Sequence, residues 1–268
     1  MPKTVVITGG TNGMGRATAL ARVARGDRVI VIGSDPAKAA AVPGARFLAA
    51  DLSSVAEVRR VAAEITGPVD ALALFANRPQ PTRRETPEGL EYTFALYYLS
   101  RYLLGELLAE QLEAAPQPVI VNVAGVGNRA GAIHWDDPQL TRGYGLVKAQ
   151  LQAGRANDLL GVAHAARRRR TRYVLYHPGF TRSGLDAHPN PLVRGLLKAA
   201  ARVAARPVEE SVRPIVEWID APPSAPLTAV DRLEELPLDF PTLDPGAAAR
   251  LDAYTAELVA RLSAPSGP

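Results

Sequence analysis

The sequence predicts an α/β fold, with a doubly wound parallel sheet in a single domain. Short apolar runs rich in β-branched residues alternate with segments of helical periodicity along most of the chain. These runs lack polar alternation, which is typical of parallel strands that are buried on both faces. No linker-like stretch divides the chain, so we assign residues 1–263 to one domain and residues 264–268 to a frayed tail.

Each element follows from a local pattern. The first strand is closed by Gly9-Gly10, and the helix after it ends at Gly26. Ser54 and Glu57 form a capping-box pattern at the start of the helix after the third strand. The expected strands are 5–8, 29–32, 47–50, 71–75, 119–123 and 173–176, and the expected helices are 13–25, 36–41, one from 53 or 54, 87–113 and 144–160. A proline-rich piece at 221–226 and an amphipathic segment at 245–262 close the same domain.

The composition excludes several classes of protein. Of the 268 residues, 47% are apolar and 22% are charged, which is a globular rather than a disordered composition. No run of about 18 apolar residues is present, so we expect no membrane span. The absence of cysteine excludes disulfides and thiolate metal sites, and with only four histidines we expect no metal site. We expect a cytoplasmic protein.

The net charge is +4, and the densest basic cluster is residues 167–170 together with Arg172. Such a cluster is typical either of a nucleic-acid surface or of a solvated helix end, where cations suit the helix C-terminus. No aromatic residues interleave with these arginines, and no nucleic-acid motif is present. We therefore favour the helix end and expect no nucleic-acid partner.

A glycine-rich turn joins the first strand to the first helix and has the sequence Thr8-Gly9-Gly10-Thr11-Asn12-Gly13-Met14-Gly15. Glycine lets a phosphate approach the backbone, and the helix N-terminus offers free N–H groups and a partial positive charge. The strand–turn–helix context favours a dinucleotide site over a merely tight turn.

The Thr-Gly-x3-Gly-x-Gly spacing of this turn resembles the short-chain dehydrogenase/reductase family. Further matches follow in the family's order and cover nearly the whole chain: Asp51-Leu52, Tyr144-x3-Lys148, and His177-Pro178-Gly179 with Thr181 and Ser183. Segments 86–104 and 177–185 look most like the retinol-dehydrogenase-like branch. The resemblance implies a Rossmann-type fold, hydride transfer with a nicotinamide cofactor, and a homodimer or tetramer packed through the long helices.

The resemblance also implies which residues hold the cofactor. Asp51 would meet the adenine, and the stretch after the sixth strand would hold the nicotinamide carboxamide and the phosphates. The implied cofactor residues are Gly9, Thr11, Asn12, Gly13, Met14, Gly15, Ser34, Asp51, Leu52, Ala76, Asn77, Lys148, Pro178, Gly179, Thr181 and Ser183.

In this family, the residues at the end of the second strand determine whether NAD or NADP binds. An acidic residue there would bind the ribose 2′-OH, and an arginine just after it would pair with a 2′-phosphate. This chain has Gly33 and Ser34 instead, with Arg16 and Lys38 as nearby cations and Asp35 as a competing acid. We favour NADP(H) and keep NAD(H) as the alternative.

Tyr144 and Lys148 are the predicted catalytic pair. Their i, i+4 spacing predicts one shared helix face, where the ammonium would lower the phenol pKa for proton exchange with a substrate oxygen. By resemblance, Lys148 would also hold the nicotinamide ribose. The competing interpretation is a chance pair on a helix surface.

The rest of the family's catalytic pattern departs at two positions. Gly125 stands where a serine would donate to the substrate oxygen, and Tyr97 stands where an asparagine would hold a water. Tyr97 is a candidate substitute donor, or else a ring that packs over the nicotinamide or fills the space of the water. After the fourth strand, Leu74 and Phe75 replace polar residues that would tie adjacent strands.

Three functions therefore stay open. The first is an atypical oxidoreductase acting on a carbonyl, alcohol or activated alkene of an apolar small molecule. The second is a non-redox cyclase, isomerase or dehydratase, and the third is a nucleotide-binding protein without catalysis. Residues 186–206 correspond to the family's variable substrate lid; their leucines face either an apolar substrate or the core. The 134–137 segment borders the substrate in this family, although an exposed His beside acids is usually structural.

Overall fold

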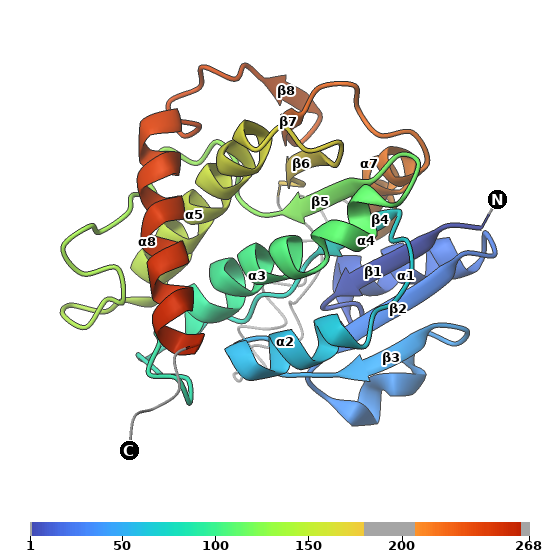
Figure 1. Ribbon diagram of the computed structural model, residues 1–268, viewed down its shortest axis with the longest axis horizontal. Coiled ribbons are helices and arrows are strands. Elements are labelled where there is room, and N and C mark those ends of the chain that lie inside the picture. Colours follow the sequence, from blue (N-terminus) through green and yellow to red (C-terminus); the bar gives the residue numbers. More distant parts are fainter. Residues whose placement is uncertain (1, 180–206, 264–268) are drawn as a thin grey trace.

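The computed structural model describes residues 2–179 and 207–263, and these residues form a three-layer α/β/α domain (Figure 1). The central sheet has eight strands in the order β3-β2-β1-β4-β5-β6-β7-β8. All neighbouring pairs are parallel except β7 and β8, which are antiparallel. The strands are β1 (Thr4–Thr8), β2 (Arg28–Gly33), β3 (Arg46–Ala49), β4 (Ala71–Leu74), β5 (Val119–Val123), β6 (Arg172–His177), β7 (Leu227–Asp231) and β8 (Glu234–Leu236). The predicted doubly wound sheet is confirmed.

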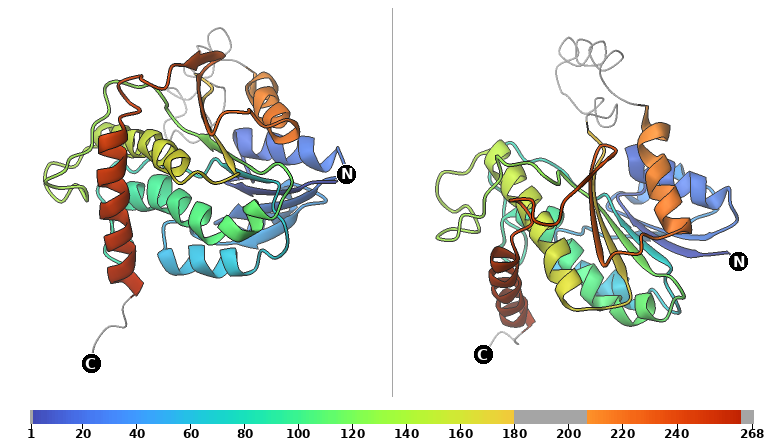
Figure 2. Two further views of the ribbon diagram at one scale, coloured as in Figure 1. Left: turned by 45° about the horizontal axis from the view of Figure 1, so that its top comes forward. Right: turned by 90° about the horizontal axis from the view of Figure 1, so that it is seen from above.

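The helices cover both faces of the sheet (Figure 2). Helices α1 (Gly13–Val23) and α7 (Val208–Asp220) pack on one face, against side chains such as Val5 and Ile7. Helices α2 (Val55–Ala63), α3 (Ser100–Leu107) and α5 (Leu146–Ala166) pack on the other. Alternate strand residues point to opposite faces, so the apolar runs supply both cores. The shorter helices are η1 (Pro36–Ala41), η2 (Phe94–Leu99) and α4 (Ala109–Glu113).

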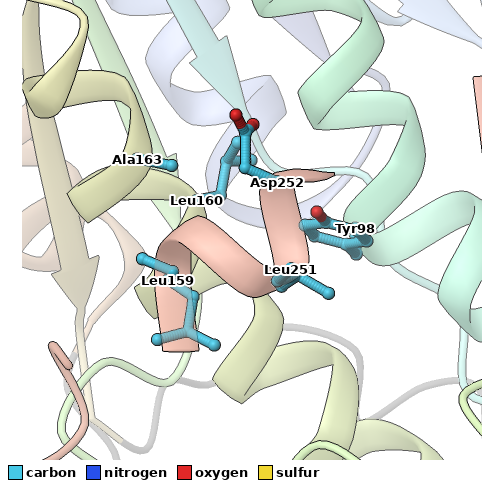
Figure 3. Close-up of a pocket in the computed structure, with 7 residues that line it drawn as sticks. Tyr98, Leu159, Leu160, Ala163, Leu251 and Asp252 are labelled. Carbon is cyan, nitrogen blue, oxygen red and sulfur yellow. The ribbon is translucent and has the colours of Figure 1, made fainter. Parts of the chain in front are cut away.

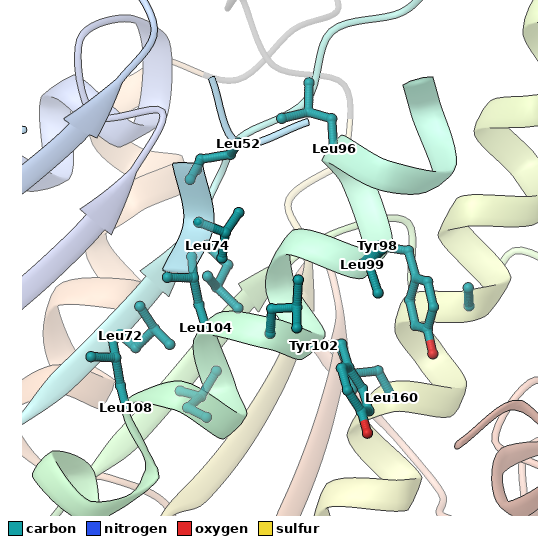
Figure 4. Packing of buried hydrophobic residues seen from close by; sticks show 14 of the residues in the cluster. Leu52, Leu72, Leu74, Leu96, Tyr98, Leu99, Tyr102, Leu104, Leu108 and Leu160 are labelled. Atoms are coloured by element: carbon teal, nitrogen blue, oxygen red, sulfur yellow. The ribbon is translucent and has the colours of Figure 1, made fainter. Parts of the chain in front are cut away.

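The larger core lies between the sheet and α2, η2, α3 and α5. Figure 4 shows leucines of β4 beside leucines of α3 and the segment after it, together with Tyr98 and Tyr102. The charged cluster predicted at the end of α5 is paired with acids: Arg169 contacts Glu106 (2.8 Å), and Arg167 contacts Asp252 (2.6 Å). Two of the five arginines in this cluster are thus paired with acids within the fold.

The C-terminal helix α8 (Pro245–Ser263) lies across the outer face of α5 and η2. The Tyr98 and Thr255 hydroxyls are 2.7 Å apart, and the Arg250 guanidinium lies 4.1 Å from the centroid of the Trp135 ring. Figure 3 shows Leu251 of α8 close to Tyr98 and to α5 side chains. This helix therefore packs on the long helices, through which the family resemblance implies that subunits associate.

The structure differs from the sequence predictions in one expected helix and in three elements that were not predicted, and two predicted segments fall outside it. The long helix expected at 87–113 starts near Tyr92, is a π-helix at 94–99, and is interrupted at Leu108 before α4. Helix α7 and strands β7 and β8 were not predicted, although the apolar spacing of α7 is helical. The predicted lid at 186–206 and the tail at 264–268 lie outside the described residues.

Within the described ranges, no helix combines the length and the apolarity that crossing a bilayer would require.

Candidate active site

The glycine-rich turn has the geometry of a phosphate cradle. Asn12 caps α1 by accepting a hydrogen bond from the Gly13 N–H (2.8 Å), and Gly9 and Gly13 have φ values of +66° and +51°. A Cβ on Gly15 would lie 2.5 Å from the Gly9 carbonyl oxygen, so only glycine allows this close approach. The first turn of α1 carries no acidic residue, and the Met14 and Gly15 N–H groups precede the first intrahelical hydrogen bond, which the Arg16 N–H makes to the Asn12 carbonyl. The cradle therefore fits a pyrophosphate at the helix N-terminus.

The neighbouring end of β2 is open and basic. Ser34 is exposed, and the Asp35 carboxylate caps η1 through Ala37 N–H (3.0 Å) and lies 3.6 Å from the Lys38 ammonium. The Arg16 Nε donates to the Ala41 carbonyl of η1 (2.9 Å). Asp35 is therefore engaged by η1 and Lys38, while Arg16 is held beside the same segment.

Asp51 lies at the end of β3, as predicted. Its Oδ1 accepts from the Ser53 N–H (3.0 Å) and hydroxyl (2.7 Å), and its side chain remains exposed, whereas Leu52 is buried. These contacts fix the turn into α2 and leave the Asp51 carboxylate facing solvent at the sheet edge.

The strand order reverses between β1 and β4, where an open α/β sheet forms its binding crevice. Thr8 Oγ1 accepts from the Phe75 N–H (3.1 Å) and the Ala76 N–H (3.3 Å), and Ala76 O accepts from Arg101 (3.1 Å). Asn77 pairs with Gln150 of α5 (2.8 Å). Thr8 and Arg101 thus supply the strand ties that Leu74 and Phe75 lack.

The end of β6 forms the far side of the crevice. Pro178 is buried, and Gly179 has a φ of +77° with Arg232 beside it. The His177 Nδ1 contacts the Asp231 carboxylate of β7 (2.8 Å). Thr181 and Ser183, the last two predicted cofactor residues, lie outside the described residues.

Tyr144 does not share a helix face with Lys148, which corrects the sequence prediction. Helix α5 begins at Leu146, and its cap Gly145 is extended, with a φ of −153°. The Tyr144 hydroxyl donates to the Gln80 carbonyl (2.9 Å), whereas the Lys148 ammonium donates to the Gly143 carbonyl (3.4 Å). Glycines on both sides of Tyr144 disfavour the extra helical turn that the prediction required.

The surroundings of Tyr144 favour the protonated phenol. Burial raises the pKa of Tyr144 above its ordinary value, and the Glu91 carboxylate raises it further, whereas the Thr93 hydroxyl opposes the rise. The expected lowering by Lys148 is absent because the ammonium is directed to Gly143 in this arrangement.

Tyr97 lies in the core and not at the open end of the crevice. Its ring is 9% exposed, packs with Ala124 and Ala153, and lies under the Arg101 guanidinium, 4.7 Å from its carbon to the ring centroid. Burial, with a contribution from Asp158, raises its pKa, which Arg101 and the Gly125 N–H oppose.

Arg101 organises a buried polar network behind Tyr97. This arginine is 2% exposed and donates to the Asn122 side chain, the Val123 carbonyl (2.9 Å) and the Ala76 carbonyl. Asn122 in turn donates to Asn157 (3.0 Å) and to the Tyr173 hydroxyl. The network joins the ends of β4 and β5 to α5, and thereby fixes the floor of the crevice.

Gly125 follows β5 with free space around it. A Cβ built there would meet no heavy atom of the described residues within 4 Å, and its φ is not in the left-handed region. No atom of Tyr97 therefore lies within 4 Å of the place that a Cβ at residue 125 would take.

Sequence reasoning missed several residues at the site. Gln80, Glu91 and Thr93 surround Tyr144, and the buried carboxyl of Asp158 accepts from the Gly127 N–H (3.3 Å) behind the β5 loop. A polar residue inside an apolar helical stretch, such as Asp158 in α5, is a signal that could have found the last of these. The other three depend on tertiary contacts between loops.

Comparisons with known proteins agree with this geometry. The family described as short chain dehydrogenase matches residues 3–136. A protein of Streptomyces sp. (strain C5) named as a daunorubicin C-13 ketoreductase, DnrU, is 28% identical over 93% of this chain and 90% of its own length. Human retinol dehydrogenase 13 is 30% identical over 69% of this chain, which spans 61% of the human protein.

The solved structures show the same fold. A Mycobacterium paratuberculosis protein of uncharacterised function matches with a TM-score of 0.75 at 23% identity, covering 97% of this chain and 96% of the other. A protein described as a short chain dehydrogenase/reductase family member matches 86% of this chain and 96% of its own, with a TM-score of 0.64 at 23% identity.

Proposed function

Because the chain belongs to the short-chain dehydrogenase family of NAD(P)-using oxidoreductases, we propose that it reduces a carbonyl or activated alkene of an apolar small molecule with NADPH. Tyr144 is the proton donor in this proposal. The observation that carries it is the placement of the Tyr144 phenol, which faces Gln80 in the loop after β4, at the same sheet edge as the glycine cradle after β1.

The cradle and the crevice fit a nicotinamide dinucleotide. The N-terminus of α1 would hold the pyrophosphate, Asp51 the adenine, and Lys148 the nicotinamide ribose. The preference for NADPH rests on the absence of an acid at Ser34, on the engagement of Asp35 by η1, and on the nearby Arg16. The bound cofactor would supply a hydride to the substrate.

The raised pKa of Tyr144 supports reduction as the proposed direction. A phenol whose pKa is raised keeps its proton at neutral pH, so it can give that proton to a substrate oxygen that gains negative charge. The reverse reaction would need the phenolate as a base, which burial and Glu91 disfavour. The relative named as a ketoreductase supports a ketone as the substrate.

The surroundings of Tyr144 also support an apolar substrate. Leu146 and Val147, which follow Tyr144 at the start of α5, are exposed large apolar side chains, with 65% of Val147 accessible. Gly125 offers no side-chain donor to the substrate oxygen, so the substrate must be activated by its own electronic structure, as in a conjugated ketone or an enone.

Two measurements test the proposal. Calorimetric titration should show tighter binding of NADPH than of NADH, and Arg16→Ala should weaken NADPH binding by about tenfold while the exposed control Arg213→Ala leaves it unchanged. Absorbance of the reduced nicotinamide should then fall with conjugated apolar ketones, and Tyr144→Phe should abolish the fall. Binding without turnover across ketones and enones would favour non-redox catalysis, and no binding of either nucleotide would refute the cofactor assignment.

A further inference from the structure

A histidine and an aspartate form a polar pair at the far side of the crevice, outside the residues assigned to the cofactor and to proton transfer. His177 ends β6 and Asp231 ends β7, and the two residues lie directly opposite each other in the parallel register (Figure 1). The His177 Nδ1 lies 2.8 Å from the Asp231 Oδ1, and 34% of the His177 side chain and 32% of the Asp231 side chain are exposed. A half-exposed polar pair at the carboxyl edge of a parallel sheet stands where such sheets bind their ligands.

The strand pattern places this pair on the side of the sheet that α5 covers. Successive residues of a strand point to opposite faces. Leu175 belongs to the core on the α5 side and Tyr176 to the core under α1 and α7, so His177 shares the face of Leu175. Asp231 points the same way, because it contacts His177 from the opposite position on β7. The pair therefore lies on the face from which α5, with Tyr144 just before it, packs on the sheet.

The strand register also brings His177 close to Gly125, the position that the family pattern assigns to the substrate oxygen. Val123 lies opposite Tyr176, and the Ala124 N–H donates to the Tyr176 carbonyl (2.9 Å). Ala124 is therefore the β5 neighbour of His177, and Gly125 follows it. Because neighbouring strands are only about 4.8 Å apart, a group held by the imidazole would lie beside the reacting carbonyl and not at a remote end of the substrate.

The contact with Asp231 determines which hydrogen bond the imidazole can offer. A carboxylate oxygen only accepts, so the proton between the two groups belongs to Nδ1, and in the neutral ring Nε2 then carries a lone pair. Among the residues that the structure describes, Nε2 has no hydrogen-bond partner. The Arg232 Nε lies 3.7 Å from the same Asp231 oxygen, and the Arg232 N–H donates to the His177 carbonyl (2.6 Å). The pair is thus held in place and presents an oriented acceptor.

We propose that the His177–Asp231 pair is a subsite for a substrate hydroxyl, and that the substrate is an α-hydroxy ketone, with a hydroxyl on the carbon next to the carbonyl. This inference rests on the proposed function for the reacting carbonyl. The substrate hydroxyl donates to the His177 Nε2, and Asp231 holds the ring in the tautomer that accepts it. The subsite makes and breaks no covalent bond; it selects the substrate and orients its carbonyl. A pair that only joined β6 to β7 would give no preference for a hydroxyl.

Histidine-ring ¹⁵N NMR tests the subsite without turnover. At about pH 8, where histidine is ordinarily neutral, long-range ¹H–¹⁵N spectra separate the two ring tautomers, and the His177 signals are assigned by their loss in His177→Leu. The wild type should show a protonated Nδ1 and an unprotonated Nε2. With NADP⁺ present, which cannot reduce a ketone, saturating α-hydroxyacetophenone should shift the Nε2 resonance, whereas acetophenone should not. A protonated Nε2 in the neutral ring, or no shift with the hydroxy ketone, overturns the inference.

Kinetics with NADPH measure the same hydrogen bond. The ratio of kcat/KM for α-hydroxyacetophenone to that for acetophenone cancels any general loss of activity in a variant. His177→Leu, which removes the acceptor, and Asp231→Asn, whose amide can donate to Nδ1 and favour the opposite tautomer, should each lower this ratio about tenfold. Glu235→Gln is the matched control and should leave the ratio unchanged. It removes an exposed carboxylate from β8 that lies opposite Val230, and hence on the other face from Asp231.

The outcomes separate this inference from the proposed function. If ketones are reduced and the ratio is unchanged in His177→Leu and Asp231→Asn, the pair only joins β6 to β7 and the inference is wrong. If Asp231→Asn slows both ketones by the same factor, its effect is structural and counts equally against the subsite. If the wild type reduces neither ketone while Nε2 responds to the hydroxy ketone, the proposed function fails and the subsite stands.

Discussion

Restoring a donor at Gly125 is the sharpest test of how this site treats its substrate. A Cβ at this position meets nothing within 4 Å among the described residues, and the backbone is not left-handed, so the first side-chain atom of Gly125→Ser needs no rearrangement. Replacing glycine where the backbone allows it also reduces the entropy of the unfolded chain, which stabilises by about 0.4–1 kcal/mol. We therefore expect the variant to fold at least as stably as the wild type.

The magnitude follows from the value of an oxyanion donor. Removing one such donor typically costs about 2.7–4 kcal/mol in the transition state, which is a factor of about 10²–10³ in rate. The Gly125 loop has no partner to orient a new hydroxyl, so we expect a smaller gain, about tenfold in kcat/KM for reduction of simple unactivated ketones.

The assay compares Gly125→Ser with Gly125→Ala under NADPH, using a simple ketone and a conjugated ketone of similar size. Alanine fills the same space without a donor, so the difference between the two variants isolates the hydroxyl. The gain should be larger for the simple ketone, because the conjugated one needs less help. Equal kcat/KM values for the serine and alanine variants on both ketones would refute the assignment of this position to the substrate oxygen.

Three further predictions concern stability and assembly. Burial raises the pKa of Asp158 to about 7, so the folded state holds a proton that the unfolded chain releases above about pH 4. Between these two pH values this group lowers the free energy of unfolding as pH rises, by up to about 1.4 kcal/mol per pH unit. Burial lowers the pKa of His164 to about 4, so His164 makes the free energy of unfolding rise with pH and partly hides the effect of Asp158. The measurement is therefore the unfolding free energy of Asp158→Asn minus that of the wild type, which should increase from pH 5 to pH 8. Arg101→Met should lower the unfolding free energy by about 3–5 kcal/mol in urea titrations, because Asn122 and two carbonyls lose their buried donor; a loss under 1 kcal/mol would contradict the role of the network. Because α8 covers the outer face of α5, light scattering after gel filtration should give the mass of a monomer; a dimer broken by substitutions on α5 would overturn this expectation.

Most of the fold was predictable because its signals are local. The first six strands along the chain contain short apolar runs, and these runs alternate with segments of helical periodicity, so the parallel sheet and its two cores follow directly. Helix α7 has the same kind of signal, since Val212, Ile215, Val216 and Ile219 are buried at helical spacing, and it could have been predicted. Strand β8 has no such signal, because its three residues are charged or partly exposed and its pairing depends on β7.

The site was less predictable than the fold because its geometry depends on loops. The i, i+4 spacing of Tyr144 and Lys148 predicts a shared helix face. In the structure Tyr144 lies before the helix, because Gly143 has a φ of +62° and Gly145 is extended. The π-helix at 94–99 turns Tyr97 into the core, where Ala124 and Ala153 enclose it. The glycines that flank Tyr144 are a local signal for the first outcome, whereas the second depends on what packs against the segment.

The polar groups at the ends of β4 and β5 differ from the family's catalytic pattern, and in the proposed function this limits the substrates that the site can reduce. The ends of β4 and β5 are joined by Arg101, whose terminal nitrogens donate to protein acceptors and whose side chain is buried, so it is not open to a substrate oxygen. Gly125 contributes no side chain, and Tyr97 is enclosed in the core. Tyr144, whose hydroxyl donates to the Gln80 carbonyl, is then the proton donor in the proposed function. A site with one proton donor and little oxyanion stabilisation favours substrates whose negative charge is delocalised within the molecule, such as conjugated or polycyclic ketones, over simple aliphatic ones.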